Sequence, residues 1–138
     1  MDNIMKLQFA SKSENESFAR TACSAFVMAL DPTVEEMTEI KTAISEAVTN
    51  AIIHGYGEKE GTITITGTID NRQVTYIIHD DGCGIPDIEK AKEPLYTGKS
   101  DSERSGMGFS IMEAFMDNLV VESDLSVGTT VTMVKELS

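Results

Sequence analysis

The sequence predicts an α/β protein, a two-layer sandwich in which helices pack on one mixed, mainly antiparallel sheet. Residues 62–66 alternate strictly between Thr and Ile, which is typical of a half-buried strand. Residues 37–51 carry apolar side chains at helical spacing, which predicts a long amphipathic helix. The 138 residues contain no internal repeat or linker, so we expect a single domain over residues 1–138. The expected order is strand, helix, helix, strand, strand, helix, strand, strand.

Composition and charge restrict the classes of ligand and the cellular location that we expect for the chain. A net charge of −12 at pH 7 argues against direct binding of nucleic acid, because phosphate backbones require a basic surface. A nucleotide remains compatible, since a helix N-terminus, glycine-loop amides and a metal ion can hold phosphates locally. No apolar run approaches the roughly 20 residues that span a bilayer, so we expect no membrane association. Two cysteines make no disulfide framework, and the cytoplasm is the expected location.

The chain is expected to begin with a strand and a helix. Residues 5–11 alternate as a short half-buried strand. Ser13 and Glu16 form the pattern of a capping box, which would open a helix ending near Leu30. Arg20 would point away from the core as a surface charge. The stripe expected to face the core is Phe18, Ala22, Phe26 and Ala29.

The second helix is expected to run from a capping box of Thr33 and Glu36 to a glycine stop at Gly55. Its expected core-facing stripe is Met37, Ile40, Ile44, Ala47, Val48 and Ala51.

A polar row lies on this second helix, where Glu46, Asn50 and His54 recur every four residues and so share a face. Asn is a poor helix former and has no obvious reason to occupy a helix interior. Ala43 and Ile53 flank the row, where a solvated face would more often carry Lys or Glu. We therefore interpret Glu46 and Asn50 as residues of a functional cleft, whereas His54 has no assigned role.

The second half is expected to contain a hairpin of residues 62–66 and 74–79 around a turn at 70–72. Residues 88–92 would form a short helix, and residues 94–105 have no period, which suggests a functional lid or disorder. The later elements are a helix with the stripe Phe109, Met112, Phe115, Met116 and Leu119, and strands that include residues 120–121 and 130–134.

Two glycine motifs are each weak signals alone. Residues 80–84 read D-x-G-x-G at a strand end, where the first Asp can accept a hydrogen bond from a ligand amine and the glycines allow a flat base to approach. Residues 106–108 read G-x-G before a helix, where free amides can bind phosphate. Residues 98–100 read G-K-S but are no P-loop, because Glu93 stands where that loop needs glycine.

The ordered set of motifs is a stronger signal than any member. Asn50 offers a hard oxygen to Mg²⁺, which commonly keeps substrate phosphates among its other ligands. Glu46 would act as a general base toward a hydroxyl or water near the γ-phosphate of a nucleotide. Arg104 would stabilise charge on the transferring phosphoryl group.

This order of motifs resembles the GHKL ATPase/kinase superfamily, which includes gyrase-type topoisomerases, chaperones, mismatch-repair ATPases and histidine kinases. Residues 15–20, 45–56 and 103–109 narrow the resemblance to the sporulation anti-sigma F factors, which are also similar in length and element order. The resemblance implies the Bergerat ATP-binding fold and a dimeric serine protein kinase. Such a kinase binds a sigma factor and uses Mg-ATP to phosphorylate an anti-anti-sigma protein.

The resemblance also assigns roles to residues. Glu46 would be the base, Asn50 the Mg²⁺ ligand, Asp80 the reader of the adenine amine, and Arg104 the contact to the γ-phosphate. Arg20 would lie on the surface that both protein partners use, which replaces its reading as a simple surface charge. The remaining residues implied at the nucleotide are Gly82, Gly84, Ile85, Thr97, Lys99, Ser105, Gly106, Met107, Gly108, Phe109, Thr129 and Thr130. Either of the two threonines 129 and 130 would support the adenine.

Other functions remain open. The chain could be a sigma-binding module in which ATP orders the lid without essential kinase activity, or a general-stress anti-sigma kinase of the same branch. An ATPase clamp of the gyrase or mismatch-repair type is disfavoured by the single-domain length. A histidine kinase core is disfavoured because no upstream segment resembles a hairpin with a phospho-accepting histidine.

Overall fold

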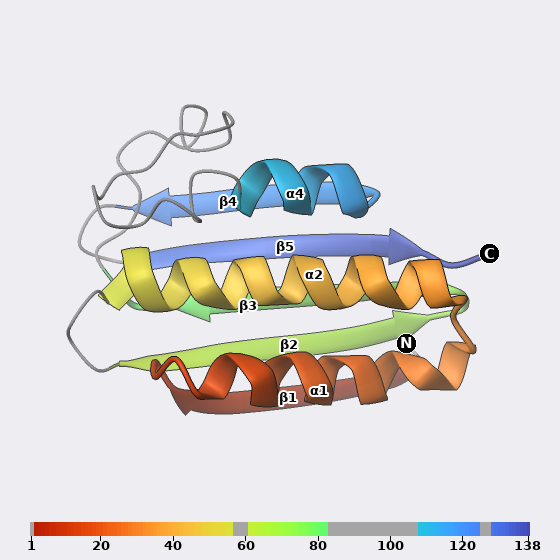
Figure 1. The fold of residues 1–138 in the computed structure, drawn as a ribbon, viewed down its shortest axis with the longest axis horizontal. Helices are drawn as coiled ribbons and strands as arrows, with labels where there is room; N and C mark the ends of the chain where they lie inside the picture. The colour runs from red at the N-terminus through yellow and green to blue at the C-terminus, as the bar shows by residue number, and fades with distance from the viewer. Residues whose placement is uncertain (1, 57–60, 83–107, 125–127) are drawn as a thin grey trace.

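The computed structural model describes residues 2–56, 61–82, 108–124 and 128–138 and has two layers (Figure 1). One layer is a five-stranded sheet, and helices cover one of its faces. The predicted sandwich is therefore confirmed, and the elements within the described residues follow the predicted order. None of the described helices is long and apolar enough to cross a membrane.

The sheet has the strand order β1-β2-β3-β5-β4. The strands are β1 (Asn3–Ala10), β2 (Thr62–Asp70), β3 (Gln73–Asp80), β4 (Asn118–Asp124) and β5 (Gly128–Glu136). All four pairings are antiparallel, so the described sheet is wholly antiparallel where the sequence analysis predicted a mixed, mainly antiparallel one. The predicted hairpin is β2 and β3, and its turn places Asn71 at a φ of 52°.

The first helix differs from its prediction at its start. Helix α1 (Asn15–Val27) has Glu14 at its N-cap, without a side-chain hydrogen bond, and continues as a 3-10 turn, η1 (Met28–Leu30). The predicted capping box of Ser13 and Glu16 does not form. The Glu16 carboxylate instead accepts a hydrogen bond from the Ser45 hydroxyl of the neighbouring helix, so a tertiary contact has replaced a local one.

The predicted core stripe of α1 is only partly correct, because Phe26 packs against the core and Ala22 is partly buried, whereas the other two members are exposed. Phe18 is 50% exposed and Ala29 is exposed. The buried residues are Ala19, Cys23, Ser24 and Val27. These small side chains let α1 approach the sheet closely enough for the Tyr76 hydroxyl of β3 to donate to the Cys23 carbonyl at 2.7 Å. At this contact small residues, and not Phe18, face the sheet.

The second helix agrees with its prediction. Helix α2 (Val34–Asn50) begins at a complete capping box, in which the Glu36 N–H donates to Thr33 Oγ1 and the Thr33 N–H donates to Glu36 Oε1. The predicted stripe is buried from Ile40 to Ala51, with Met37 partly buried against the core. The chain then continues as a π-helix, η2 (Ala51–Tyr56), in place of the predicted simple stop near Gly55.

Helix α4 (Gly108–Phe115) packs beside α2. Phe109 and Met112 of its predicted stripe are buried, as are Met116 and Leu119 beyond the helix end, and Phe115 is partly buried. Lys135 of β5 donates to the Phe115 carbonyl at 2.6 Å and to Glu39 of α2 at 2.8 Å. The predicted short helix at 88–92 and lid at 94–105 lie outside the described residues.

Candidate functional site

Several candidate residues gather at one end of the molecule. Figure 1 shows the C-terminal end of α2 on the same side as the C-terminal end of β3 and the N-terminal end of β5. These ends carry Asn50, Asp80 and Thr129, which are 7%, 4% and 6% exposed. Three polar side chains are thus buried at the end of a sheet, where burial needs a compensating partner.

Asn50 is the clearest member of the site. Among the described residues its Oδ1 and Nδ2 are buried and have no hydrogen-bond partner. Buried amides without partners are rare in folded proteins and carry a desolvation cost. The mid-helix Asn that was unexplained in the sequence is therefore also unexplained by its contacts with the described residues. A ligand that accepts and donates at this amide would explain it.

The N-terminal end of α4 lies directly against Asn50. A Cβ built at Gly108 would be 2.7 Å from Asn50 Nδ2 and 3.2 Å from Oδ1. Gly108 therefore allows α4 to begin next to the orphaned amide, and a larger residue would push the two helices apart. The structure thus brings together two residues that are 58 positions apart in the sequence (108 − 50) and that the motifs had placed in one site.

Glu46 lies one turn before Asn50 on α2 and is partly buried. The π-helix η2 begins immediately after Asn50. Short π segments are frequent at functional sites, because the extra residue in the turn redirects the side chains around it.

Asp80 is the last residue of β3 and is buried. The Gly82 N–H donates to its Oδ1 at 2.9 Å, so the first part of the D-x-G-x-G motif forms a tight turn. Burial raises the pKa of the Asp80 carboxyl above its usual value, and the backbone hydrogen bond from Gly82 and the charge of His79 oppose this rise. A buried carboxylate at a strand end suits a hydrogen-bond donor on a ligand.

The strand register separates the two threonines. Thr129 is the cross-strand partner of Asp80, so both side chains lie on the helix-covered face of the sheet. Thr130 is the partner of His79 on the opposite face, where their side chains are 2.8 Å apart at Oγ1 and Nδ1. Thr129 is therefore in position to share a ligand with Asp80, and Thr130 is not.

Arg20 lies between α1 and α2. Its guanidinium is 3.4 Å from Glu16 Oε2 and 3.4 Å from the Ser45 hydroxyl, and its side chain is 40% exposed. The side chain is thus accessible, as predicted, but it points along the α1–α2 boundary. This exposed cation on an acidic protein is anchored by two neighbours.

Part of the candidate set lies outside the described residues. These residues are Gly84, Ile85, Thr97, Lys99, Arg104, Ser105, Gly106 and Met107. Phe109 is described and belongs to the hydrophobic core.

Two residues were missed by the sequence analysis as site residues. Gly128 has a φ of +132°, and a Cβ there would be 2.1 Å from the Asp80 carbonyl oxygen. Ser123 of β4 has its hydroxyl 2.9 Å from Thr129 Oγ1. Only the glycine had a signal in the sequence, since a Gly before a strand often marks a tight approach.

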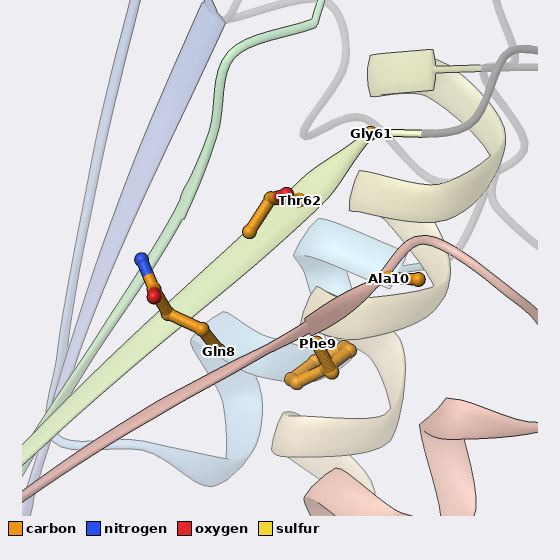
Figure 2. Close-up of a pocket in the computed structure, with 5 residues that line it drawn as sticks. All are labelled: Gln8, Phe9, Ala10, Gly61 and Thr62. Carbon is orange, nitrogen blue, oxygen red and sulfur yellow. The ribbon is translucent and has the colours of Figure 1, made fainter.

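An open pocket lies at the end of β1 and the start of β2. Figure 2 shows that it is lined by Gln8, Phe9 and Ala10 on β1 and by Gly61 and Thr62 at the start of β2. The lining holds no ionisable side chain, so we assign no chemistry to it.

Comparison with known proteins gives the family. Residues 9–135 match the family model of the histidine kinase-like ATPase domain. The chain is 56% identical over 134 residues to an anti-sigma F factor of Clostridium kluyveri, covering 97% of this chain and 94% of the relative. It is 55% identical over 139 residues to an anti-sigma F factor of Geobacillus kaustophilus, covering 100% and 95%.

Solved structures support the same fold. The RsbU and RsbW domains of Rv1364c from Mycobacterium tuberculosis match with a TM-score of 0.71 and 18% identity, over 98% of this chain and 32% of that one. The catalytic domain of the histidine kinase ThkA matches with a TM-score of 0.62 and 19% identity, over 96% of both chains. From the family model and the full-length relatives, this chain belongs to the anti-sigma F factors of the histidine kinase-like ATPase family.

Proposed function

We propose that this protein is an ATP-dependent serine kinase that also binds and inhibits a sporulation sigma factor. The observation that carries the proposal is the buried amide of Asn50, which has no partner among the described residues and lies against Gly108 at the start of α4. An amide oxygen is a hard ligand of the kind that Mg²⁺ prefers. The donor set therefore fits the ion that would accompany ATP, and Asn50 would hold it.

The residues around Asn50 supply the chemistry of phosphoryl transfer. Glu46 would accept the proton of the substrate serine while the serine hydroxyl oxygen attacks the γ-phosphorus of ATP. The bond between the γ-phosphorus and the oxygen that leaves with ADP would break at the same time. When bound, Mg²⁺ would neutralise charge on the phosphates. Asp80 would accept a hydrogen bond from the adenine amine, and Arg104 would stabilise the charge on the γ-phosphate. The proposed substrate is a serine of an anti-anti-sigma protein.

The partner surface is proposed around Arg20. Its guanidinium is accessible and held by Glu16 and Ser45, so it can form a charge-assisted hydrogen bond at little further entropic cost. We propose that the sigma factor and the anti-anti-sigma protein both use this surface, that the protein acts as a homodimer, and that it works in the cytoplasm.

A phosphotransfer assay tests the kinase. Purified protein with Mg-ATP and a candidate anti-anti-sigma protein is expected to give phosphoserine, detected by mass spectrometry. Glu46→Gln is expected to lower the rate by about 10²–10⁴-fold, the range typical of a lost general base. Glu35→Gln is the matched control, because it makes the same change at an exposed position of the same helix.

The result of this assay distinguishes a kinase from a binding module and from an ATPase. Absence of phosphoserine from folded wild type, with ATP-dependent sigma binding intact, would favour a binding module over a kinase. Release of inorganic phosphate without any protein acceptor would favour an ATPase. Light scattering of the wild type measures the oligomeric state directly.

A further inference from the structure

Helices α2 and α4 run antiparallel and come together at both of their ends. At one end, α4 begins at Gly108, which lies against the Asn50 amide at the end of α2. At the other end, the carbonyl of Phe115 is joined through Lys135 to Glu39, near the start of α2. Figure 1 shows the two helices on the same face of the sheet, and they pack against each other.

Lys135 makes the second of these contacts from inside the sandwich. It follows Met133 by two positions on β5, so both side chains lie on the helix-covered face of the sheet. The Lys135 side chain is 10% exposed, and its ammonium group donates to the Phe115 carbonyl oxygen at 2.6 Å and to Glu39 Oε1 at 2.8 Å. One charged group therefore holds both helices to the sheet through hydrogen bonds of the strong, charge-assisted kind.

These bonds bear on where α4 lies along its own axis. The helix has eight residues, about two turns, and a helix this short is not stable without tertiary contacts. Its buried side chains Phe109 and Met112 pack by apolar contact, which is non-directional. A hydrogen bond, in contrast, weakens steeply when its angle changes. We therefore expect the bond at Phe115 to set the axial position of α4 relative to α2.

The start of α4 has little tolerance for a shift. A Cβ at Gly108 would be 2.7 Å from Asn50 Nδ2, so the helix backbone and the amide are already in close contact. Asn50 is 7% exposed and has no partner among the described residues, as expected at a ligand site. The first N–H groups of a helix are not used within it and can bind phosphate. A shift of α4 would move these N–H groups relative to Asn50.

We propose that Lys135 is a positioning residue for the phosphates of the nucleotide, because it holds α4 against α2 and so sets where the helix begins relative to Asn50. This inference rests on the proposed binding of ATP. Phe115 and Gly108 are seven positions apart (115 − 108), or roughly 10 Å of helix, so Lys135 acts through α4 and not by touching the nucleotide.

The test compares the affinities of ADP and adenosine, which share the base and the sugar and differ in the phosphates. Isothermal titration calorimetry of the full chain with Mg²⁺ measures both, and the wild type is expected to bind ADP more tightly. Lys135→Gln removes the charge and shortens the side chain, so the ratio of ADP affinity to adenosine affinity is expected to fall about tenfold. Glu39→Gln keeps an acceptor at the same position and is expected to lower the ratio less.

Tyr76→Phe is the matched control. It removes another buried hydrogen bond between the sheet and a helix, from the Tyr76 hydroxyl on β3 to the Cys23 carbonyl on α1. Urea unfolding is expected to show a loss of stability in this variant, and calorimetry is expected to show the wild-type ratio. If Lys135 had only a structural role, Lys135→Gln would behave in the same way.

A Lys135→Gln variant that keeps the wild-type ratio would overturn the inference, and so would equal losses of affinity for ADP and adenosine. If Lys135→Gln does not fold, Glu39→Gln decides, since it leaves the contact to Phe115 in place: an unchanged ratio then rejects the proposal. A folded wild type that binds neither ligand would overturn the proposed function and this inference together. A wild type that binds ADP tightly, with a ratio that Lys135→Gln does not alter, would overturn only the inference.

Discussion

At the scale of single residues, the candidate site contains buried polar side chains, and one of them has no hydrogen-bond partner among the described residues. That residue is Asn50, whose amide lies against Gly108 at the start of α4. Within the part of the chain that the structure describes, folding therefore bears the cost of an unpaired amide, which a bound ligand would offset. Such a residue favours function over stability.

This view of Asn50 predicts that removing the amide stabilises the free protein. Asn50→Leu, of similar volume, is expected to raise the free energy of unfolding by about 1–2 kcal/mol, because an unpaired buried amide is lost. The same variant is expected to lose binding of Mg-ATP. Thermal melting without nucleotide and calorimetry with Mg-ATP measure the two effects. A lower melting temperature would contradict the prediction.

The raised pKa of the Asp80 carboxyl predicts how the stability of the protein changes with pH. Burial raises the pKa of the Asp80 carboxyl, so the folded protein holds the proton more tightly than the unfolded chain does. Between the ordinary aspartate pKa and the raised value, stability therefore falls as the pH rises. Nucleotide binding that uses the carboxylate must show the opposite trend and weaken as the pH falls through the same window.

Asp80→Asn removes the titration and provides the comparison. The difference in ADP affinity between wild type and Asp80→Asn is expected to shrink on acidification through that window. Because both proteins share every other titrating group, the difference isolates Asp80. A difference that stays constant with pH would contradict the role of the carboxylate.

Residue-level reasoning from the sequence could find Asn50 but not Ser123. An Asn in the middle of a helix conflicts with the low helix propensity of that residue, and this conflict can be recognised from the sequence alone. Ser123 conflicts with no such local preference, so the sequence around it does not single it out. Its relation to Thr129 and Asp80 exists only through the register of three strands.

At the scale of elements, the start and the buried face of α2 could be predicted from its own residues, whereas those of α1 depend on contacts with neighbouring elements. The capping box of α2 formed as predicted, and its apolar stripe packs against the core. In α1 the predicted box did not form, because Glu16 bonds to Ser45 of α2. Only part of the predicted stripe packs against the core, because residues such as Ala19 and Cys23 are buried in place of Phe18. A helix with strong local signals could be predicted, whereas one determined by its neighbours could not.

The α2 cap gives an element-scale prediction. Thr33→Ala is expected to lower the free energy of unfolding by about 1 kcal/mol, because the Glu36 N–H loses its acceptor. Thr38→Ala makes the same change in the helix interior, where Ala is favoured, and is expected to be neutral or slightly stabilising. Urea unfolding followed by circular dichroism measures both. Equal midpoints would show that the box contributes nothing.

At the scale of the whole molecule, the element order could be predicted from the sequence but the strand order could not. Periodicity along the chain separates helices from strands and says nothing about which strands pair, apart from tight hairpins. That β5 lies between β3 and β4 is what places Thr129 beside Asp80. The site could thus be predicted as an inventory of residues, and its arrangement required the fold.

Lys135 connects the sheet to the helix layer, so we expect its substitution to lower the stability of the whole protein. Its ammonium group joins β5 to the end of α4 and to Glu39 on α2. Lys135→Met is expected to cost about 2–3 kcal/mol of unfolding free energy, because a partly buried carbonyl and a partly buried carboxylate lose their partner. Lys41→Met, at an exposed position of α2, is the control. If both variants unfold at the same urea concentration, the connection is not stabilising.

The position of β5 also bears on how the protein is made. β5 follows every other element in the chain, yet it is an interior strand, with β3 on one side and β4 on the other. During synthesis the earlier strands therefore leave the ribosome with an unfilled gap, and β4 has no strand to pair with. The pairing that sets Thr129 beside Asp80 is among the last long-range contacts to close, so the base site proposed between them cannot form in a nascent chain until the sheet is complete.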